Sequence, residues 1–95
     1  MVQLIDPQRR FPLGCLVATP AVLATVPNGE IQRALARHHA GDWGDVCPED
    51  RELNDQALAA GSRLFSVYRA ANGTKFWIIT EWNRSVTTVL LPADY

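Results

Sequence analysis

The last third of the chain consists of apolar runs, separated by polar turn residues, that are typical of β-strands. Runs rich in β-branched and aromatic side chains occupy residues 62–70, 74–82 and 85–91. Asn72-Gly73 separates the first two runs and is the strongest short signal for a β-hairpin, while Asn83-Arg84 suits a second tight turn. These signals predict three antiparallel strands in a C-terminal β-meander.

The first two thirds of the chain carry the end signals of three short helices. Thr19-Pro20 predicts a helix start, because a capping hydroxyl precedes a proline at the first helical position. Asn28 predicts a second start, and Pro48, followed by acidic residues, predicts a third helix that ends at Gly61. The helices are expected at about residues 20–25, 29–39 and 48–60.

Together these elements predict the α+β fold class. Residues 13–18 (LGCLVA) indicate a short buried strand that joins the meander. The expected fold is therefore a three- or four-stranded antiparallel sheet with two or three short helices. Residues 1–12 contain two prolines and are expected to form a loosely ordered N-terminal arm, which leaves residues 13–95 as a single α+β domain.

The expected turns decide which side chains share a face of the sheet. A two-residue turn at Asn72-Gly73 pairs Val67 with Ile78, and a turn at Asn83-Arg84 pairs Ile78 with Val89. One face then carries Phe65, Val67, Phe76, Ile78, Val89 and Leu91. The other face carries Leu64, Tyr68, Trp77, Ile79, Val86 and Leu90. Both faces are apolar. Either the helices and the arm cover both faces, or one face is a self-association or partner surface. A third alternative is that the register is wrong by one residue, which would exchange the side chains between the two faces.

Composition and charge exclude several classes of protein. The 95 residues are 47% hydrophobic and 20% charged, which is globular rather than disordered composition. Nine Lys and Arg against ten Asp and Glu give a net charge of −1, with Arg9-Arg10 as the only adjacent basic pair, so nucleic-acid binding is not favoured. No signal peptide precedes Cys15 and Cys47, and no apolar run approaches the ~20 residues of a membrane span. We expect a cytoplasmic protein with free thiols, no cofactor and no membrane contact.

A polar cluster holds residue types that bind metal ions. Its members are His38, His39, Asp42, Asp45, Cys47 and Asp50. Their spacing matches neither a zinc motif nor a calcium loop, and adjacent histidines on a helix point in different directions. We therefore interpret the cluster as a polar helix end followed by an acidic loop, with metal binding as the alternative.

The GDWGD segment at residues 41–45 places a large aromatic side chain between two glycines. Trp43 is either a loop anchor packed on the core or a hot spot of an interface, and the flanking Asp42 and Asp45 suit a basic partner. A further group of polar residues surrounds the last hairpin. Its threonines are expected to stabilise the sheet as cross-strand pairs, and Glu81 and Arg84 are expected to form a surface ion pair. The alternative is that this group forms a functional site. The candidate partner-binding residues are Asp42, Trp43, Asp45, Trp77 and Arg84, and no catalytic or metal-binding residue is assigned.

Three segments carry a resemblance to a family of small bacterial proteins. They are GDWG at residues 41–44, WIITE at 77–81 and TTVLLP at 87–92. The chain resembles that family over residues 11–95. Its members are common on plasmids and other mobile elements and often carry the label "type I restriction endonuclease subunit M" or "plasmid-related protein". Ninety-five residues cannot hold a methyltransferase domain. The resemblance implies an accessory or anti-defence role and no catalytic residue.

These observations leave three functions open. The first is a non-enzymatic protein-interaction module from a mobile genetic element, which binds a protein partner or forms a homodimer. The second is a nucleic-acid-associated accessory protein that uses basic residues along one edge of the sheet. Those residues are Arg9, Arg10, Arg63, Arg69, Lys75 and Arg84. The third is a small metal-dependent hydrolase that uses the polar cluster at residues 38–50.

Overall fold

The computed structural model describes residues 10–95. The elements are β1 (Cys15–Ala18), α1 (Pro20–Thr25), α2 (Asn28–His39), α3 (Pro48–Ala60), β2 (Leu64–Arg69), β3 (Lys75–Thr80), β4 (Val86–Leu90) and the short 3-10 helix η1 (Pro92–Asp94). Most of the expected arm at residues 1–12 lies outside the described residues. Within its last three residues, Arg10 donates its backbone N–H to the carbonyl of His39 and Phe11 is buried.

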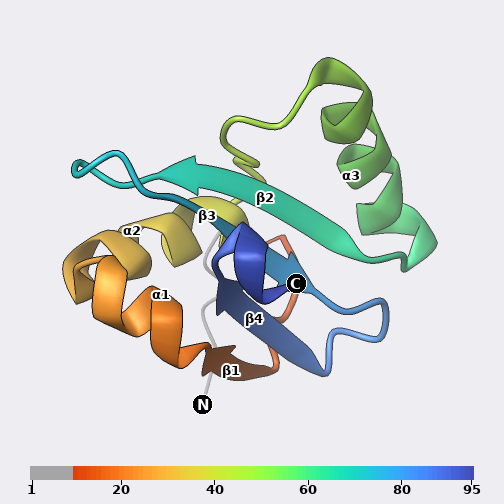
Figure 1. The fold of residues 1–95 in the computed structure, drawn as a ribbon. Coiled ribbons are helices and arrows are strands. Elements are labelled where there is room, and N and C mark those ends of the chain that lie inside the picture. Colours follow the sequence, from red (N-terminus) through yellow and green to blue (C-terminus); the bar gives the residue numbers. More distant parts are fainter. Residues whose placement is uncertain (1–9) are drawn as a thin grey trace, which may run out of the picture.

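One four-stranded sheet with three helices confirms the expected α+β fold class. The strand order is β1-β4-β3-β2, and the last three strands form the antiparallel meander that the sequence predicts. The first strand differs from the expectation, because β1 pairs with β4 in parallel. Figure 1 shows α1 and α2 together on one side of the sheet, while α3 lies along the β2 side.

Helices α1 and α3 begin and end where the sequence signals stand. Helix α2 differs at its start, because Asn28 is its first residue, Pro27 is its N-cap and no side chain caps it, so the expectation that Asn28 caps this helix is wrong. The hydroxyl of Thr19 accepts the N–H of Val22 at 3.3 Å and caps α1, whose first residue is Pro20. Pro48 opens α3, and Gly61 ends that helix in the left-handed conformation with φ 72°. Among the helices of residues 10–95, none is long and apolar enough to cross a membrane.

The first hairpin has a three-residue loop, so the two-residue turn expected at Asn72-Gly73 is wrong. Ala70 donates its N–H to the carbonyl of Thr74 at 2.8 Å, and Gly73 takes φ 88° at the third loop position. The side chain of Asn72 is bound to the carbonyl of Thr25 at 2.9 Å, which ties the loop to the end of α1. The extra loop residue shifts the register by one, so each side chain of β2 lies on the face opposite to the one expected relative to β3.

The corrected register reassigns the side chains of β2 to the two faces. Val67 lies opposite Trp77 rather than Ile78, and Tyr68 lies opposite Phe76. The second hairpin was predicted in the correct register, with Ile78 opposite Val89. One face therefore carries Leu64, Ser66, Tyr68, Phe76, Ile78, Thr80, Thr87 and Val89. The other, which we name the open face, carries Phe65, Val67, Trp77, Ile79, Thr88 and Leu90.

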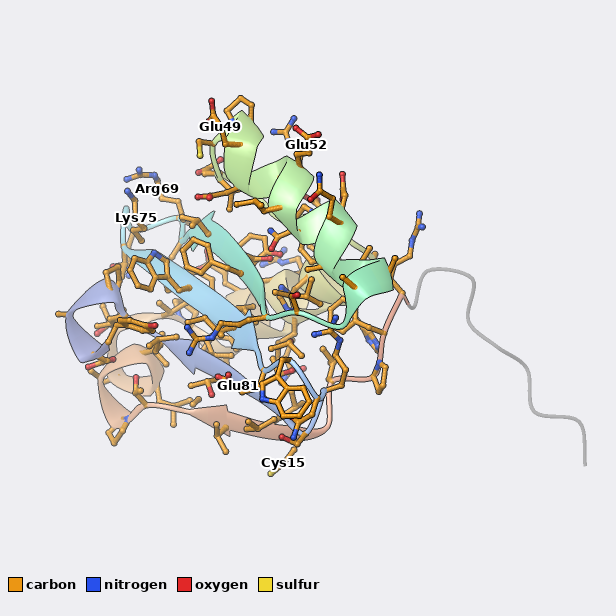
Figure 2. The ribbon with its side chains drawn as sticks, turned by 90° about the vertical axis from the view of Figure 1, so that its right-hand side faces the viewer. Cys15, Glu49, Glu52, Arg69, Lys75 and Glu81 are labelled. Atoms are coloured by element: carbon orange, nitrogen blue, oxygen red, sulfur yellow. The ribbon has the colours of Figure 1, made fainter. Side chains whose placement is uncertain are left out.

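The two faces differ in what covers them. Apolar side chains of α1 and α2, among them Val22, Ile31 and Leu35, pack on the first face and form the main core. A smaller cluster at the β2 side joins Trp43 and Ala57 with residues of both faces. Figure 2 shows α3 beside β2. The α-helices cover one face of the sheet fully and the other only at its β2 side, while the short helix η1 packs against β3 on the open face.

The outer edge of β2 is closed by two segments. Asn54 of α3 donates to the carbonyl of Phe65 at 2.6 Å and accepts its N–H at 3.0 Å. Val67 donates its N–H to the carbonyl of Trp43 at 3.1 Å and accepts the N–H of Asp45 at 2.7 Å. The backbone groups that an edge strand leaves unpaired are thus satisfied within the domain at these positions.

The other edge strand, β1, is exposed, so the expectation of a buried strand at residues 13–18 is wrong. Cys15, Leu16 and Val17 are all exposed, and Ala18 is half-buried. The apolar run suggested burial on both faces, but among residues 10–95 β1 has a neighbouring strand on one side only, and no helix packs across it. The expected inert, buried thiol of Cys15 is therefore at the surface.

Candidate functional site

A hollow of about 310 Å³ lies on the open face. Its floor is formed by Ile79, Thr88 and Leu90, which the pairing of β3 and β4 places side by side. Ile79 and Leu90 are buried, while Thr88 is half-buried. The floor is therefore apolar with one hydroxyl, in the part of the open face that no α-helix covers.

Charged side chains border this open-face hollow. They are Arg63, Glu81 and Asp94, with Tyr95 as an aromatic wall. Arg63 lies 3.3 Å from a carboxylate oxygen of Glu81 and donates to the hydroxyl of Tyr95 at 2.7 Å. The hydrogen bond to Tyr95 and the contact with Glu81 raise the pKa of Arg63 above its ordinary value. Because both members of the ion pair are substantially exposed, the pair adds little stability and stays available to a ligand.

Aromatic side chains continue the apolar surface away from the hollow. Trp77 is half-buried and contacts Phe65 edge to face, with ring centroids 5.0 Å apart. Tyr95 lies 5.8 Å from Trp77 on the other side and is 69% exposed. Among the predicted partner-binding residues, Trp77 is thus the one that lies on the open face.

Trp43 lies in the interior, 3% exposed, so the structure favours the loop-anchor interpretation over the hot-spot interpretation. Its indole N–H donates to Asp55 of α3 at 3.0 Å, and its ring packs against Phe11 and His38. The tryptophan therefore holds the GDWGD segment against α3 and α2. A partner that contacts this segment would contact Asp42 and Asp45 rather than the indole ring.

The two aspartates of that segment are exposed, and both take part in local structure. Asp42 accepts from Arg37 at 2.7 Å and from the N–H of Gly44 at 3.2 Å, and its backbone carbonyl accepts the hydroxyl of Tyr68. The hydrogen bond from Arg37 lowers the pKa of Asp42. Asp45 contributes its backbone N–H to the bridge with β2, and its side chain is exposed.

Arg84 is bound to the backbone of its own domain. Its guanidinium donates to the carbonyls of Ser62, Glu81 and Ala57, the last at 3.0 Å near the C-terminal end of α3. Partial burial lowers its pKa. Because these bonds use much of its donor capacity, Arg84 joins the last hairpin to α3, and the surface ion pair forms between Glu81 and Arg63 instead.

His38 is the polar residue at the centre of the core. It is fully buried, with Nδ1 2.6 Å from the hydroxyl of Ser66 and Nε2 2.9 Å from that of Thr80. Thr80 contacts the hydroxyl of Thr87 at 2.7 Å, and Thr87 donates to the carbonyl of Leu13 at 2.7 Å. We name this chain the His38 network.

The hydroxyl chain of the His38 network fixes the proton on Nε2. A carbonyl only accepts, so Thr87 donates to Leu13, and Thr80 must then donate to Thr87. The hydroxyl of Thr80 has no second proton, so Nε2 of His38 donates to it, and in the neutral ring Ser66 donates to Nδ1. Burial is the main cause that lowers the pKa of His38, to about 3, and the charges of His39 and Arg84 add to it. The histidine is therefore neutral, and its serine partner is buried as well.

The polar cluster at residues 38–50 is dispersed in the fold. His38 faces the core, and Asp42 pairs with Arg37. Cys47 is exposed at the start of α3, and contacts with Glu49 and Asp50 raise the pKa of its thiol. Within residues 10–95, no three His, Cys, Asp or Glu side chains are grouped closely enough to hold a metal ion.

A smaller hollow of about 150 Å³ lies between α2 and the first hairpin. Three of its walls are guanidinium groups, from Arg33, Arg37 and Arg69. We name it the arginine hollow. Arg37 stacks over the ring of Tyr68 at 4.9 Å while it pairs with Asp42. Figure 2 shows Arg69 beside Lys75 at the hairpin end of β2 and β3.

Sequence reasoning did not identify the residues that border the open-face hollow. Arg63 and Tyr95 lie 32 positions apart and meet only because β2 begins beside the C-terminal end of the chain. Thr88 was assigned to a polar group of the hairpin, although its side chain shares the open face with Ile79. Successive side chains of a strand point to opposite faces, so Thr88 must lie on the face opposite to the buried Thr87. This was the signal in the sequence that could have placed Thr88 on the open face.

Comparisons of the chain with protein-family models, with curated proteins and with solved structures found no match. The resemblance to the plasmid-related bacterial family is accordingly still an expectation from the sequence. A function for the chain is therefore inferred from the geometry of its surface.

Proposed function

We propose that the chain is a non-enzymatic protein-interaction module of a mobile genetic element, which acts in the cytoplasm through its open face. The open-face hollow carries this proposal, because it combines an apolar floor with a charged and aromatic border. An apolar centre inside a polar rim is the usual anatomy of a protein interface.

The chemistry of the hollow indicates what the partner inserts. Ile79 and Leu90 favour an apolar side chain, and Arg63 and Asp94 at the border can each form a hydrogen bond with partner backbone. Trp77 and Tyr95 extend the contact area next to the hollow, and both are residue types that contribute strongly at interfaces. The proposed ligand is therefore an exposed apolar side chain on a folded or extended protein segment.

Replacing Thr88 with arginine is expected to abolish partner binding without unfolding the domain. The half-buried Thr88 side chain lies in the floor, so a larger cationic side chain fills the hollow and leaves the core intact. We expect binding to weaken by roughly tenfold or more. The measurement is affinity capture from nuclease-treated host lysate, followed by titration of the captured protein against the purified variants.

Thr25→Arg is the matched control, since Thr25 is exposed at the end of α1 on the other side of the sheet. The control should bind as the native chain does, and both variants should keep the native melting temperature. A partner that binds the Thr88→Arg chain with native affinity would place the interface elsewhere. An empty capture with the native chain would contradict the interaction role itself.

A second candidate function, a nucleic-acid-associated protein, is supported by the arginine hollow. Arg33 and Arg69 there suit a phosphate, and the stacked pair of Arg37 and Tyr68 suits a base. Glu30 also lines this hollow and Arg37 is paired with Asp42, so the site is less basic than three free arginines would make it. This candidate predicts that oligonucleotide affinity falls steeply with salt and that Arg33→Glu reduces both affinity and salt slope. Arg51→Glu on α3 is the control. Fluorescence anisotropy that shows no binding at low salt would remove the candidate.

A further inference from the structure

The two edges of the sheet differ. The β2 edge is closed by Asn54 and by the segment at residues 43–45, as described above. The β1 edge has β4 on its inner side and, among the described residues, no backbone hydrogen bond on its outer side. An edge strand with free N–H and C=O groups is a template for a further strand.

The β1 edge is short, at four residues, but its own side chains do not prevent pairing. Residues 11–29 contain no Asp, Glu, Lys, Arg or His, and the carboxylate at its C-terminal end, that of Asp94, is bound to the hydroxyl of Thr19 at 2.6 Å. Within this stretch Leu16 is 52% exposed, Val17 is 42% exposed and Leu23 of α1 is 57% exposed. The strand has no proline between Cys15 and Ala18. An uncharged, apolar, regular edge favours strand addition.

The hydrogen bonds to β4 show which backbone groups of β1 point outward. Cys15 donates its N–H to the carbonyl of Ser85 at 2.9 Å, and Thr19 donates to Val89 at 3.0 Å. Because the direction of backbone groups alternates along a strand, the odd-numbered residues point toward β4. Leu16 and Ala18 therefore direct both their N–H and their C=O groups away from the sheet, symmetrically about Val17.

We propose that a second copy of the chain pairs with β1 in the antiparallel direction, about a two-fold axis at Val17. In this register Leu16 of one copy exchanges both backbone hydrogen bonds with Ala18 of the other, and no outward group of the strand stays unpaired. The two Val17 side chains lie opposite each other in a non-hydrogen-bonded pair. The two sheets join into one continuous sheet across the dimer.

The closed edge of β2 argues for a second copy and for a closed dimer. Head-to-tail addition of copies would require a free β2 edge, which Asn54 and residues 43–45 occupy. A free β1 edge can therefore meet only another β1 edge, and the same surface then serves both copies. Two uncharged strands also meet without electrostatic repulsion. This inference rests on the proposed interaction role. It assigns a second copy of the chain to the β1 edge and a different protein to the open face.

Sedimentation velocity of the full chain at micromolar to millimolar concentration tests the dimer. The native chain should sediment as a dimer, and Val17→Lys should sediment as a folded monomer because two ammonium groups face each other at the axis. Leu53→Lys is the matched control, since Leu53 is 60% exposed on α3 and far from β1 in sequence and element. A native chain that is monomeric throughout, or a Val17→Lys chain that is still dimeric, would overturn the proposal.

Cross-linking tests the register independently of stability. In a background with Cys15→Ser and Cys47→Ser, Val17→Cys should form an intermolecular disulfide rapidly on addition of diamide, because about 4.5 Å separates the Cα atoms of such a pair. Leu53→Cys in the same background should not. A dimer that forms only after residues 1–9 are deleted would identify that segment as the occupant of the edge and overturn the proposal. A chain that does not form the dimer but still captures a partner through the open face would overturn this inference and leave the proposed function standing.

Discussion

Replacing Gly44 with alanine is expected to destabilise the domain by about 4 kcal/mol or more, enough to unfold much of the population. A Cβ atom at this position would lie 2.0 Å from the carbonyl oxygen of Val67 and 2.9 Å from the ring of Tyr68. Gly44 also has φ 72°, which L side chains rarely adopt. The contact closes the β2 edge, so relief of the clash requires that the bridge to Val67 opens.

Gly61→Ala separates the two causes of this loss. Gly61 has the same φ of 72°, and nothing lies within 4 Å of the Cβ position. We expect it to cost about 1 kcal/mol from backbone strain alone. Urea unfolding of both variants measures the difference. Equal losses would show that the segment at residues 43–45 moves freely away from β2, which would also remove the barrier to head-to-tail addition at that edge.

The elements of this fold were predictable because their signals are local. Thr19-Pro20, Pro48 and Gly61 act within one turn of the helix that they start or end. Apolar runs in the last third placed all three strands of the meander. The register of the first hairpin was not predictable from its turn residues. Asn72 and Gly73 also suit a three-residue loop, and a bond from Asn72 to α1 accompanies that loop here.

The site residues depended on contacts that the sequence does not encode locally. An aromatic residue between glycines suggested either an anchor or a hot spot, and only the packing of Phe11 and Asp55 around Trp43 distinguishes them. Arg84 suggested a surface charge, but its guanidinium is bound to backbone carbonyls, one of which belongs to Ala57 of α3. Burial of β1 was misjudged because apolar composition does not show whether a strand is central or at an edge.

The His38 network gives the domain a specific sensitivity to acid. His38 has a pKa of about 3 in the folded chain against 6.5 in its ordinary state, so the unfolded chain binds the proton more readily. Its contribution to stability is complete above pH 6.5 and is lost as the pH falls from 6.5 toward 3. The full difference corresponds to about 5 kcal/mol, which is comparable with the total stability of a small domain.

His38→Leu is expected to remove this dependence. At neutral pH the variant should lose about 2–3 kcal/mol, because Ser66 and Thr80 lose their buried partner. Between pH 6.5 and 4 its unfolding free energy should stay level, while that of the native chain falls. The carboxylate of Asp42, whose pKa is lowered below 3.8, affects stability only in more acidic solution.

Urea unfolding at a series of pH values from 7.5 to 4 measures both chains, a range that starts above the ordinary pKa of His38 and extends toward its lowered value. His39→Leu is the control, since His39 is next in sequence but only partly buried and outside the network. It should keep the native acid dependence. If His38→Leu loses stability with acid as steeply as the native chain does, then carboxylates cause the loss of stability in acid. The neutral His38 would then have no role in the acid dependence.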